Sequence, residues 1–331
     1  MTSTSTLKRG PLGGTDLTVS ALCLGAGPFG TSCRGPDLDR LINAYRDADG
    51  NFLDTAHSYA VWLPNGDGAS ERAIGDYTRR NGAGDLVIAT KGGHPPMAGY
   101  RRTDAWLSPA RIAADIDDSL ARLGCDTIDL YWLHRDDTRL AAGEIVETLN
   151  GEIRRGRIRF IGASNWSAAR IAAANLHASA HGLHGFVASQ SEWNLSRKNI
   201  PPDALADTSG TAMRFATPDD VAWHRRERFT LIPYTSGAGG YFASDGRRCA
   251  ETYGNPVSRA RLNRCRELAA TVGAAPGQVA LAWLLNQNFP VIPIVGTTNP
   301  EHLEQAMGAT SLSMTPAQVR WLSDDPEEAR P

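Results

Sequence analysis

The sequence predicts an α/β protein folded as a closed (β/α)8 TIM barrel, with an N-terminal β-hairpin and long loops at the C-terminal mouth. Three observations lead to this fold class. Short apolar runs, often β-branched, recur eight times, helical patterns separate most of them, and polar residues stand at the ends of six. Near-continuous apolar runs suit parallel strands buried on both faces, and eight strand–helix alternations favour closure into a barrel. We expect one barrel domain over residues 1–331.

The predicted strands follow a small hairpin. The hairpin turns around Gly13-Gly14, because paired glycines suit a tight turn between two short extended segments. The eight apolar runs then predict strands at 21–25, 51–55, 86–91, 127–134, 157–165, 185–191, 229–236 and 291–296.

Helix signals fill most of the intervals between these strands. Pro109 stands where an N1 proline starts a helix, apolar residues follow at helical spacing to Leu123, and Gly124 ends the pattern. Similar patterns predict helices over 142–153 and 168–176, the second with Ser167 as its N-cap.

Two stretches interrupt this rhythm and predict loops. Residues 192–228 are long and polar and contain Pro201-Pro202, and residues 237–256 are rich in glycine. Loops of this length are uncommon in compact domains unless they carry function, so we expect both to lie over one end of the barrel.

Composition excludes several classes of protein. Hydrophobic residues make up 41% of the chain and charged residues 21%, which is incompatible with a disordered chain. Lys and Arg (34) nearly balance Asp and Glu (36), so nucleic acid is not an expected partner. No apolar run is long enough to predict a membrane span. Five cysteines without a CxxC pair favour the reducing cytoplasm, and no feature specifies an oligomeric state.

Polar side chains gather at the predicted strand ends. In a barrel of this class all strands end at the same mouth, where the chemistry lies. One polar strand end means little, whereas six of them indicate a shared site. The residues at these ends are Asp54, Lys91, His134, Ser164, Asn165, Gln190, Tyr234, Thr235 and Ser236.

Each of these residues also has a purely structural interpretation. Asp54 could cap the following helix, His134 could be a hydrogen-bonded core histidine, and Tyr59 could be packing at the rim. Lys91 differs, because lysine occurs only three times in a chain that otherwise uses Arg as its basic residue. A lysine kept at a strand end indicates a need for a compact ammonium group, which the larger guanidinium does not provide.

Several ordered motifs resemble the aldo-keto reductase family. They are NFLDTAHSYA, SERAIG, LVIATK, IDLYWLH and GASN, followed by Gln190 and IPIVGTTNPEHLEQA, and they span essentially the whole chain. The resemblance implies a barrel that binds a nicotinamide cofactor in extended form and reduces an aldehyde, ketone, keto-sugar or other small carbonyl compound. Carried over by motif, it implies a catalytic tetrad of Asp54, Tyr59, Lys91 and His134.

The chemistry of carbonyl reduction explains these residue types. Hydride attack on the carbonyl carbon leaves negative charge on oxygen, which Tyr59 would protonate as general acid. A tyrosine has an unperturbed pKa of about 10, and we expect the Lys91 ammonium to stabilise the phenolate and shift that pKa toward neutrality. Asp54 would hold Lys91, and His134 would hydrogen-bond the carbonyl oxygen and orient the substrate.

The same resemblance implies a cofactor-binding set. Ser164, Asn165 and Gln190 suit a carboxamide, Tyr234 would stack on the nicotinamide ring, and the segments after the last two strands would approach phosphate groups. The resemblance favours NADP(H). NAD(H) is the alternative, because no Lys or Arg stands near Gly296 or His302 to bind a 2′-phosphate. The complete predicted set is Gly27, Asp54, Ser164, Asn165, Gln190, Tyr234, Thr235, Ser236, Gly296, Thr297, Thr298, His302 and Gln305.

Other motifs have competing interpretations. GAGPFG at 25–30 satisfies GxGxxG, but a dinucleotide fingerprint needs these glycines to open a helix, and Pro28 with the following TSCRGPD indicates a loop. His177, His181 and His184 fall near a predicted helix end on the outer ring, so we expect a surface cluster and no metal site. Four aromatic residues follow strand ends and could line a substrate pocket or simply pack: Trp62, Trp166, Trp193 and Tyr241.

Two function classes compete with a reductase. A nicotinamide-binding auxiliary subunit, as in channel-associated proteins with the same barrel, could keep the tetrad, although we expect no added N-terminal interaction segment, which favours an enzyme. A barrel hydrolase or metal enzyme would need an acidic and histidine cluster at the strand ends, which this sequence lacks.

Overall fold

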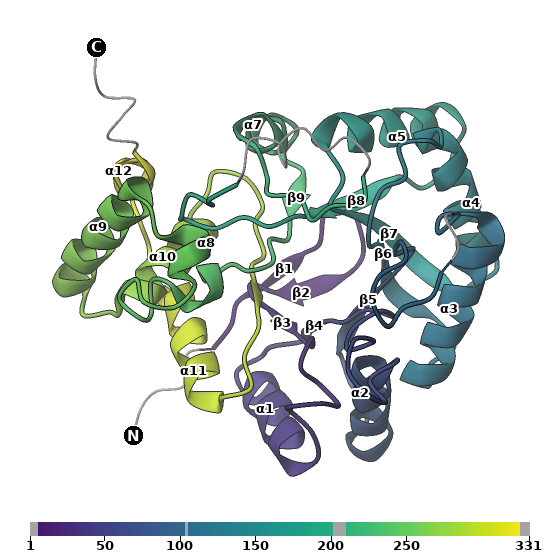
Figure 1. Cartoon of the computed structure of the whole chain (residues 1–331), viewed down its shortest axis with the longest axis horizontal. Coiled ribbons are helices and arrows are strands. Elements are labelled where there is room, and N and C mark those ends of the chain that lie inside the picture. Colours follow the sequence, from purple (N-terminus) through teal and green to yellow (C-terminus); the bar gives the residue numbers. More distant parts are fainter. Residues whose placement is uncertain (1–5, 103–104, 201–209, 325–331) are drawn as a thin grey trace.

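Eight parallel strands form a closed barrel in the computed structural model, which describes residues 6–102, 105–200 and 210–324 (Figure 1). Neighbouring strands pair in the order β10-β3-β4-β5-β6-β7-β8-β9. The barrel closes between β9 and the segment that leads into β10. There Leu231 N donates to Pro290 O and Ile292 N donates to Leu231 O, each at 3.0 Å. The strands are β3 (Cys23–Gly25), β4 (Phe52–Asp54), β5 (Val87–Gly92), β6 (Ile128–Leu133), β7 (Ile158–Ser164), β8 (Phe186–Gln190), β9 (Thr230–Leu231) and β10 (Ile294–Val295).

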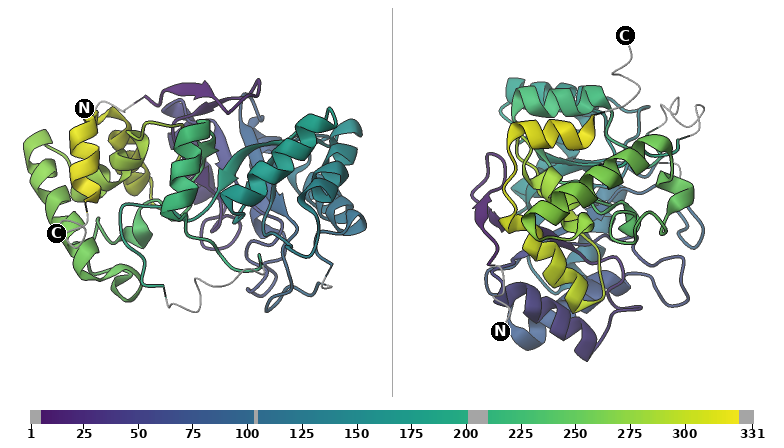
Figure 2. Two further views of the ribbon diagram at one scale, coloured as in Figure 1. Left: turned by 90° about the horizontal axis from the view of Figure 1, so that it is seen from above. Right: turned by 90° about the vertical axis from the view of Figure 1, so that its left-hand side faces the viewer.

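All eight predicted strands are confirmed, and so is the N-terminal hairpin. The antiparallel strands β1 (Arg9–Pro11) and β2 (Thr18–Ser20) pair across the predicted glycine turn. Leu12 and Leu17 from this hairpin pack against interior barrel residues such as Phe52. The hairpin therefore covers the N-terminal end of the barrel, and Figure 2 (left) shows it on the side opposite the long loops.

The predicted capping residues begin and end the helices of the outer layer. Pro109 begins α3, and Gly124 ends it in a left-handed conformation (φ +68°) that favours glycine. Ser167 Oγ accepts a hydrogen bond from Arg170 N at the start of α5, which continues one turn beyond its predicted end to Ala180. The helices are α1 (Pro36–Asp47), α2 (Ala69–Asn81), α3 (Pro109–Leu123), α4 (Ala142–Arg154), α5 (Ala168–Ala180), α7 (Pro218–Glu227), α8 (Ala250–Tyr253), α9 (Pro256–Val272), α10 (Pro276–Leu285), α11 (Pro300–Gly308) and α12 (Pro316–Ser323).

The two predicted loops contain helices, which corrects the sequence interpretation. In 192–228, helix α7 begins after Thr217, whose hydroxyl accepts from Asp220 N while the Asp220 carboxylate accepts from Thr217 N. This reciprocal capping stabilises a helix whose polar surface hid it in the sequence. In 237–256, the short helix α8 and a 3₁₀ turn at Ala238–Gly240 replace a plain loop. Residues 201–209, which include Pro201-Pro202 of the predicted loop, lie outside the described residues.

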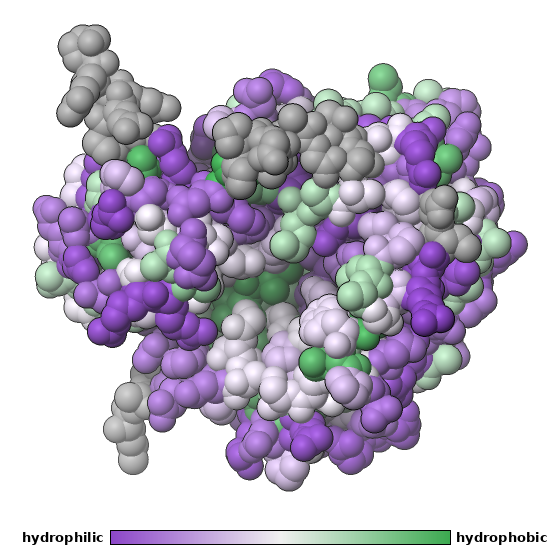
Figure 3. All heavy atoms as spheres, viewed as in Figure 1, coloured by the Kyte–Doolittle hydropathy of each residue, from purple (hydrophilic) through white to green (hydrophobic). Residues whose placement is uncertain are grey.

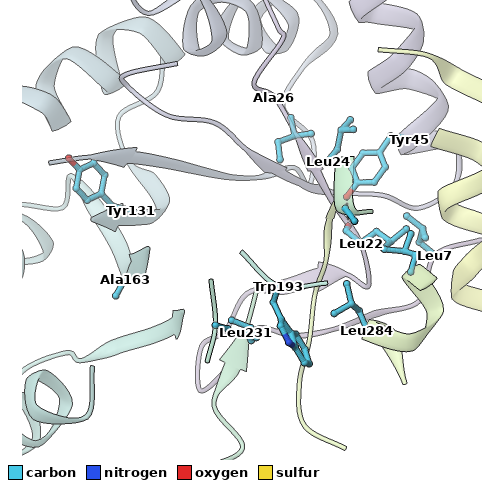
Figure 4. Packing of buried hydrophobic residues seen from close by; sticks show 14 of the residues in the cluster. Leu7, Leu22, Leu24, Ala26, Tyr45, Tyr131, Ala163, Trp193, Leu231 and Leu284 are labelled. Atoms are coloured by element: carbon cyan, nitrogen blue, oxygen red, sulfur yellow. Dashed lines mark hydrogen bonds between the residues drawn. The ribbon is translucent and has the colours of Figure 1, made fainter. Parts of the chain in front are cut away.

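Apolar side chains cover both faces of the sheet, one layer outside the barrel and one inside it. The outer layer packs between strands and helices, and Figure 4 shows part of it, including Leu24, Tyr45 and Leu284. The inner layer fills the barrel, where Trp132 is fully buried. A Cβ atom at position 162 would lie 2.3 Å from the Trp132 ring, so glycine there makes room for the indole.

The GAGPFG run does not form a dinucleotide fingerprint. Gly25 ends β3, and the remaining residues form an irregular loop with an isolated bridge between Phe29 and Cys33. Helix α1 begins only at Pro36, so these glycines do not open a helix and the barrel interpretation holds. Among the described residues, no single helix is long and apolar enough to span a membrane, and only α9 with α10, as a pair bent by 95°, reaches that length and composition.

Candidate active site

The alternation of strand residues directs the predicted catalytic side chains into the barrel. In β5, Val87 and Ala89 belong to the interior cluster, and Lys91 is two residues further on, which places it on the same face. The same step of two takes the chain from Trp132 to His134 and from Phe52 to Asp54. Each strand thus contributes apolar residues to the core and one polar residue above it. Figure 3 shows a hollow near the centre of the face on which the strands end.

Lys91 holds the centre of the site. Its ammonium Nζ donates to Asp54 Oδ2 at 2.5 Å, to the Thr55 carbonyl at 2.8 Å and to Tyr59 Oη at 2.9 Å. These three bonds use all three ammonium protons. Lys91 and Asp54 are 1% and 2% exposed, so this is a buried ion pair with one phenol added to it.

The charge states of these groups follow from burial and from one another. Burial lowers the pKa of Lys91, but the adjacent Asp54 carboxylate and the Tyr59 oxygen more than compensate and raise it. Burial raises the pKa of Tyr59, and the Lys91 ammonium opposes this increase without reversing it. The expected shift of Tyr59 toward neutrality is therefore wrong for the protein alone. Near neutral pH the site holds a charged lysine and a protonated tyrosine.

His134 lies beside Tyr59 and is neutral. The two ring centroids are 6.0 Å apart in an edge-on arrangement. Burial, followed by the nearby positive charge of Arg135, lowers the pKa of His134 well below its ordinary value. Ser58 Oγ lies 3.2 Å from His134 Nδ1, and when this hydroxyl donates to Nδ1 the ring proton resides on Nε2. His134 can then donate a neutral hydrogen bond into the mouth. Sequence reasoning missed Ser58, although its position next to Tyr59 was a signal.

The predicted carboxamide-binding residues lie together, but they are not equally available. Asn165 Nδ2 donates to His134 O at 3.1 Å and to Ser164 Oγ at 3.0 Å, while its Oδ1 accepts from Arg214 N and Tyr234 Oη, each at 2.8 Å. All four hydrogen-bonding positions of this amide are in use. Asn165 therefore positions its neighbours.

Two groups remain for a ligand amide. Gln190 Nε2 donates to Asp54 Oδ1 at 3.0 Å, which leaves Gln190 Oε1 as an acceptor without a protein partner among the described residues. The Ser164 hydroxyl keeps its own proton to donate. One donor and one acceptor fit a primary carboxamide, so the residues present are compatible with a nicotinamide group.

The segment after β9 is held in an unusual backbone conformation. Thr235 and Ala238 have positive φ values of 53° and 50°. Asn165, directly after β7, and Ala60, in the loop that follows β4, have values of 63° and 67°. Such angles are unfavourable for residues with a side chain, and they commonly mark functional sites. Ser236 Oγ donates to Ile294 O at 2.6 Å, which ties this segment to β10.

The predicted phosphate segment is exposed and poor in positive charge. Gly296, Thr298, His302 and Gln305 are exposed, and Thr297 is half-buried. Helix α11 begins here, and a helix N-terminus favours anions. Its first turn carries the acidic residue Glu301, so the structure supplies no compensating cation from this segment. Gly27 is half-buried in the loop that follows β3.

The predicted substrate-binding tryptophans separate into two groups. Trp62 is 57% exposed on the loop that carries Tyr59, so it can still contact a ligand at the mouth. Trp166 is 2% exposed and packs against Phe186, and Trp193 packs against Trp283 within the outer apolar layer (Figure 4). The prediction that these two rings line the pocket is wrong, because their apolar area is buried between strands and helices.

The other predicted pocket aromatic and the histidine cluster also lie away from the site. Tyr241 is 1% exposed and packs against Phe242. His177 stacks on His181 at the end of α5 and contacts Glu147 on α4. No group of side chains suited to a metal ion occurs among the described residues.

Comparisons with known proteins agree with this architecture. The family model described as "Aldo/keto reductase family" matches residues 21–323. Norsolorinic acid reductase B of Aspergillus parasiticus is 28% identical over 323 residues, which cover 92% of this chain and 80% of that protein. The uncharacterized oxidoreductase YrpG of Bacillus subtilis is 29% identical over 319 residues, covering 95% and 94%. A probable voltage-gated potassium channel subunit beta of Oryza sativa subsp. japonica is 30% identical over 312 residues, covering 90% and 89%.

Proposed function

Since the chain belongs to the aldo/keto reductase family, we propose that it reduces an aldehyde or ketone to an alcohol by hydride transfer from NAD(P)H, with Tyr59 as the proton donor. The observation that carries this proposal is the position of the Lys91 ammonium between the Asp54 carboxylate and the Tyr59 hydroxyl. A purely structural tyrosine has no need of a buried ion pair at its oxygen.

Each catalytic residue has a separate role in the proposed reaction. When bound, a dihydronicotinamide supplies the hydride that adds to the carbonyl carbon. Tyr59 gives its hydroxyl proton to the carbonyl oxygen as negative charge develops there, and the phenolate that remains is stabilised by Lys91 at 2.9 Å. Asp54 keeps Lys91 in place, so the positive charge is already oriented before the reaction begins.

His134 orients the substrate in this proposal. Its neutral ring can donate through Nε2 to the carbonyl oxygen while Ser58 contacts Nδ1. A charged imidazolium would add to the positive charge of Lys91 and Arg135, and those same charges together with burial keep His134 neutral. The hydrogen bond therefore polarises the carbonyl and leaves proton donation to Tyr59.

The cofactor would be held from several strand ends. Ser164 and Gln190 offer a donor and an acceptor to the carboxamide, and the Tyr234 ring is held beside them by its bond to Asn165. Members of the family use nicotinamide cofactors, typically NADPH, and we favour NADP(H) with NAD(H) as the alternative. Because the segment from Gly296 to Gln305 offers no Lys or Arg, the preference for a 2′-phosphate should be small.

The remaining parts of the proposal concern organisation and location. We treat residues 1–331 as one barrel domain. All five cysteines are free, and we place the protein in the reducing cytoplasm on that basis. The expected partner is a small carbonyl compound, with no nucleic acid and no membrane.

The test combines binding with turnover. Purified protein is titrated with NADPH and NADH by tryptophan fluorescence, then mixed with a panel of aldehydes, ketones and keto-sugars while nicotinamide absorbance is followed. Turnover that is lost in Tyr59→Phe supports the proposal. Tight cofactor binding without turnover of any carbonyl compound would instead favour an auxiliary subunit, and absence of binding to folded protein would refute both.

A further inference from the structure

Arg135 is a buried cation to which the described part of the chain supplies no carboxylate partner. It directly follows His134 at the end of β6 and is 7% exposed. Its guanidinium donates to the His134 carbonyl at 2.8 Å and to the Thr211 carbonyl at 3.1 Å, and it makes no ion pair with any residue that the structure describes. Buried charges are normally paired, because an isolated one loses its hydration without compensation.

The neighbouring acidic residues do not fill this role. Asp136, the next residue, makes two bonds to Arg170 at 2.8 and 2.9 Å, and Asp137 pairs with Arg139 at 2.8 Å. Other enclosed arginines do have partners. Arg102 pairs with Asp115 at 2.9 Å, and Arg122 pairs with Glu71 at 3.2 Å. Of Arg102, Arg122 and Arg135, only Arg135 has no carboxylate partner among the described residues, and it lies beside the candidate active site.

The charge of Arg135 acts on the groups that surround the mouth. It favours the phenolate forms of Tyr59 and Tyr234. Burial, followed by the charge of Arg135, lowers the pKa of His134 well below its ordinary value and that of His94 to about 4. Lys91 and Asp54 compensate each other. The mouth therefore carries a net positive charge at this position.

The free part of the guanidinium matches one carboxylate. Two of its five N–H groups donate to the carbonyls, so three remain. A carboxylate carries one negative charge and two coplanar oxygens, which this arrangement can balance and bind, whereas a phosphate monoester carries more charge than one guanidinium compensates. The proposed cofactor phosphates belong to a different wall, since β6 is four strands away from β10 in the ring of eight.

We propose that Arg135 is an anion-recognition residue that binds a carboxylate on the carbonyl substrate, so that the preferred substrates are oxo acids. This inference rests on the proposed function, because it assigns a substrate class to the same site. Arg135 would hold the far end of the substrate while Tyr59 and His134 act on the carbonyl oxygen.

The test compares acids with their neutral esters. Reduction of 3-formylbenzoate and 4-formylbenzoate is measured against the corresponding methyl formylbenzoates, which keep the aldehyde and remove the charge. We expect at least one acid to exceed its ester at least tenfold in kcat/KM. Arg135→Gln, which keeps donors for the carbonyls but not the charge, should reduce that ratio at least tenfold, and Arg135→Lys should retain part of it. Arg139→Gln, the same change at a 58% exposed ion-paired arginine, should leave the ratio unchanged.

Binding without turnover separates this inference from the proposed function. Benzoate and benzamide are titrated into the protein with and without NADPH, and benzoate should bind at least tenfold more tightly, with this difference lost in Arg135→Gln. If neither formylbenzoate nor ester is reduced but this difference is present, the proposed function fails and the anion site stands. An acid-to-ester ratio near one in the native protein, or one that Arg135→Gln leaves intact, would overturn the inference. The inference would also be overturned if Arg135→Gln lost affinity for NADPH and kept its affinity for benzoate. If Arg135→Gln does not fold, the inference is tested by the acid-to-ester and benzoate-to-benzamide ratios of the native protein and of Arg135→Lys.

Discussion

Replacing Lys91 by Arg or Met tests the centre of the site. The ammonium has three protons and three acceptors, Asp54, the Thr55 carbonyl and Tyr59, at 2.5 to 2.9 Å. Arginine keeps the charge, but its planar group is larger and cannot place one nitrogen within reach of all three oxygens. Methionine removes the charge and leaves the buried Asp54 carboxylate with the Gln190 amide as its remaining side-chain partner.

The expected magnitude follows from the distance between Lys91 and Tyr59. With an effective dielectric constant of about 20, unit charges at 2.9 Å attract by roughly 6 kcal/mol, which is the scale on which Lys91 stabilises the phenolate. Even partial loss of this term should lower hydride transfer by ~10²–10⁴-fold in Lys91→Arg, the range for a disabled general acid. Lys91→Met should lose at least as much, and it should lower the free energy of unfolding by about 3–5 kcal/mol because it breaks a buried ion pair.

The assay is single-turnover hydride transfer at saturating cofactor, together with urea unfolding of each variant. Lys198→Arg is unsuitable as a control, because Lys198 pairs with the buried Glu192, which also bonds Tyr253. Lys8→Arg is the matched control, since Lys8 is exposed. Hydride transfer within a few-fold of the native rate in Lys91→Arg would refute the reasoning and reduce Lys91 to a structural cation.

Four further predictions concern the proton donor, pH, packing and the cofactor. Tyr59→Phe should keep folding and cofactor affinity and lower turnover at least ~10²-fold, so near-native turnover would assign the proton to His134 or water. Because burial raises the pKa of Tyr59, kcat/KM for carbonyl reduction should stay level from about pH 7 to pH 9 and fall only above the ordinary phenol value of about 10; a decline centred below pH 9 would contradict this. Gly162→Ala should lower the free energy of unfolding by about 1–3 kcal/mol in urea titrations, because the new methyl meets the Trp132 ring, and an unchanged midpoint would show that the indole moves freely. Titrations should give an NADPH-to-NADH affinity ratio well under a thousandfold, a ratio worth about 4 kcal/mol that would require cations outside the segment from Gly296 to Gln305.

The sequence predicted the features that depend on local pattern. Strand alternation places Lys91 and His134 two residues beyond interior side chains, and capping residues such as Pro109 and Gly124 set helix ends. Helix α7 was not predicted because its signal is the reciprocal capping by Thr217, which resembles loop composition.

Features that depend on contacts between distant segments were not predictable in this way. Whether Trp166 and Trp193 face a pocket or the helices is decided by neighbours such as Phe186 and Trp283. The same holds for Asn165, whose amide is fully used by partners up to 69 residues away in the chain. The pKa of Tyr59 depends on burial, which residue type and spacing do not report.

The closing seam of the barrel has a consequence for the lifetime of the folded chain. The strands on its two sides, β9 and β10, have two residues each, so few backbone hydrogen bonds hold them together. We therefore expect local unfolding of the sheet to begin at this seam. The segments that follow these strands begin at Tyr234 and Gly296, which under the proposed function grip one dinucleotide from both sides. A ligand that contacts both sides of the seam stabilises the closed barrel, because its binding free energy adds to the free energy needed to open the seam. Under the proposed function, the concentration of the nicotinamide dinucleotide would then set the rate of proteolysis of the folded protein as well as the rate of carbonyl reduction.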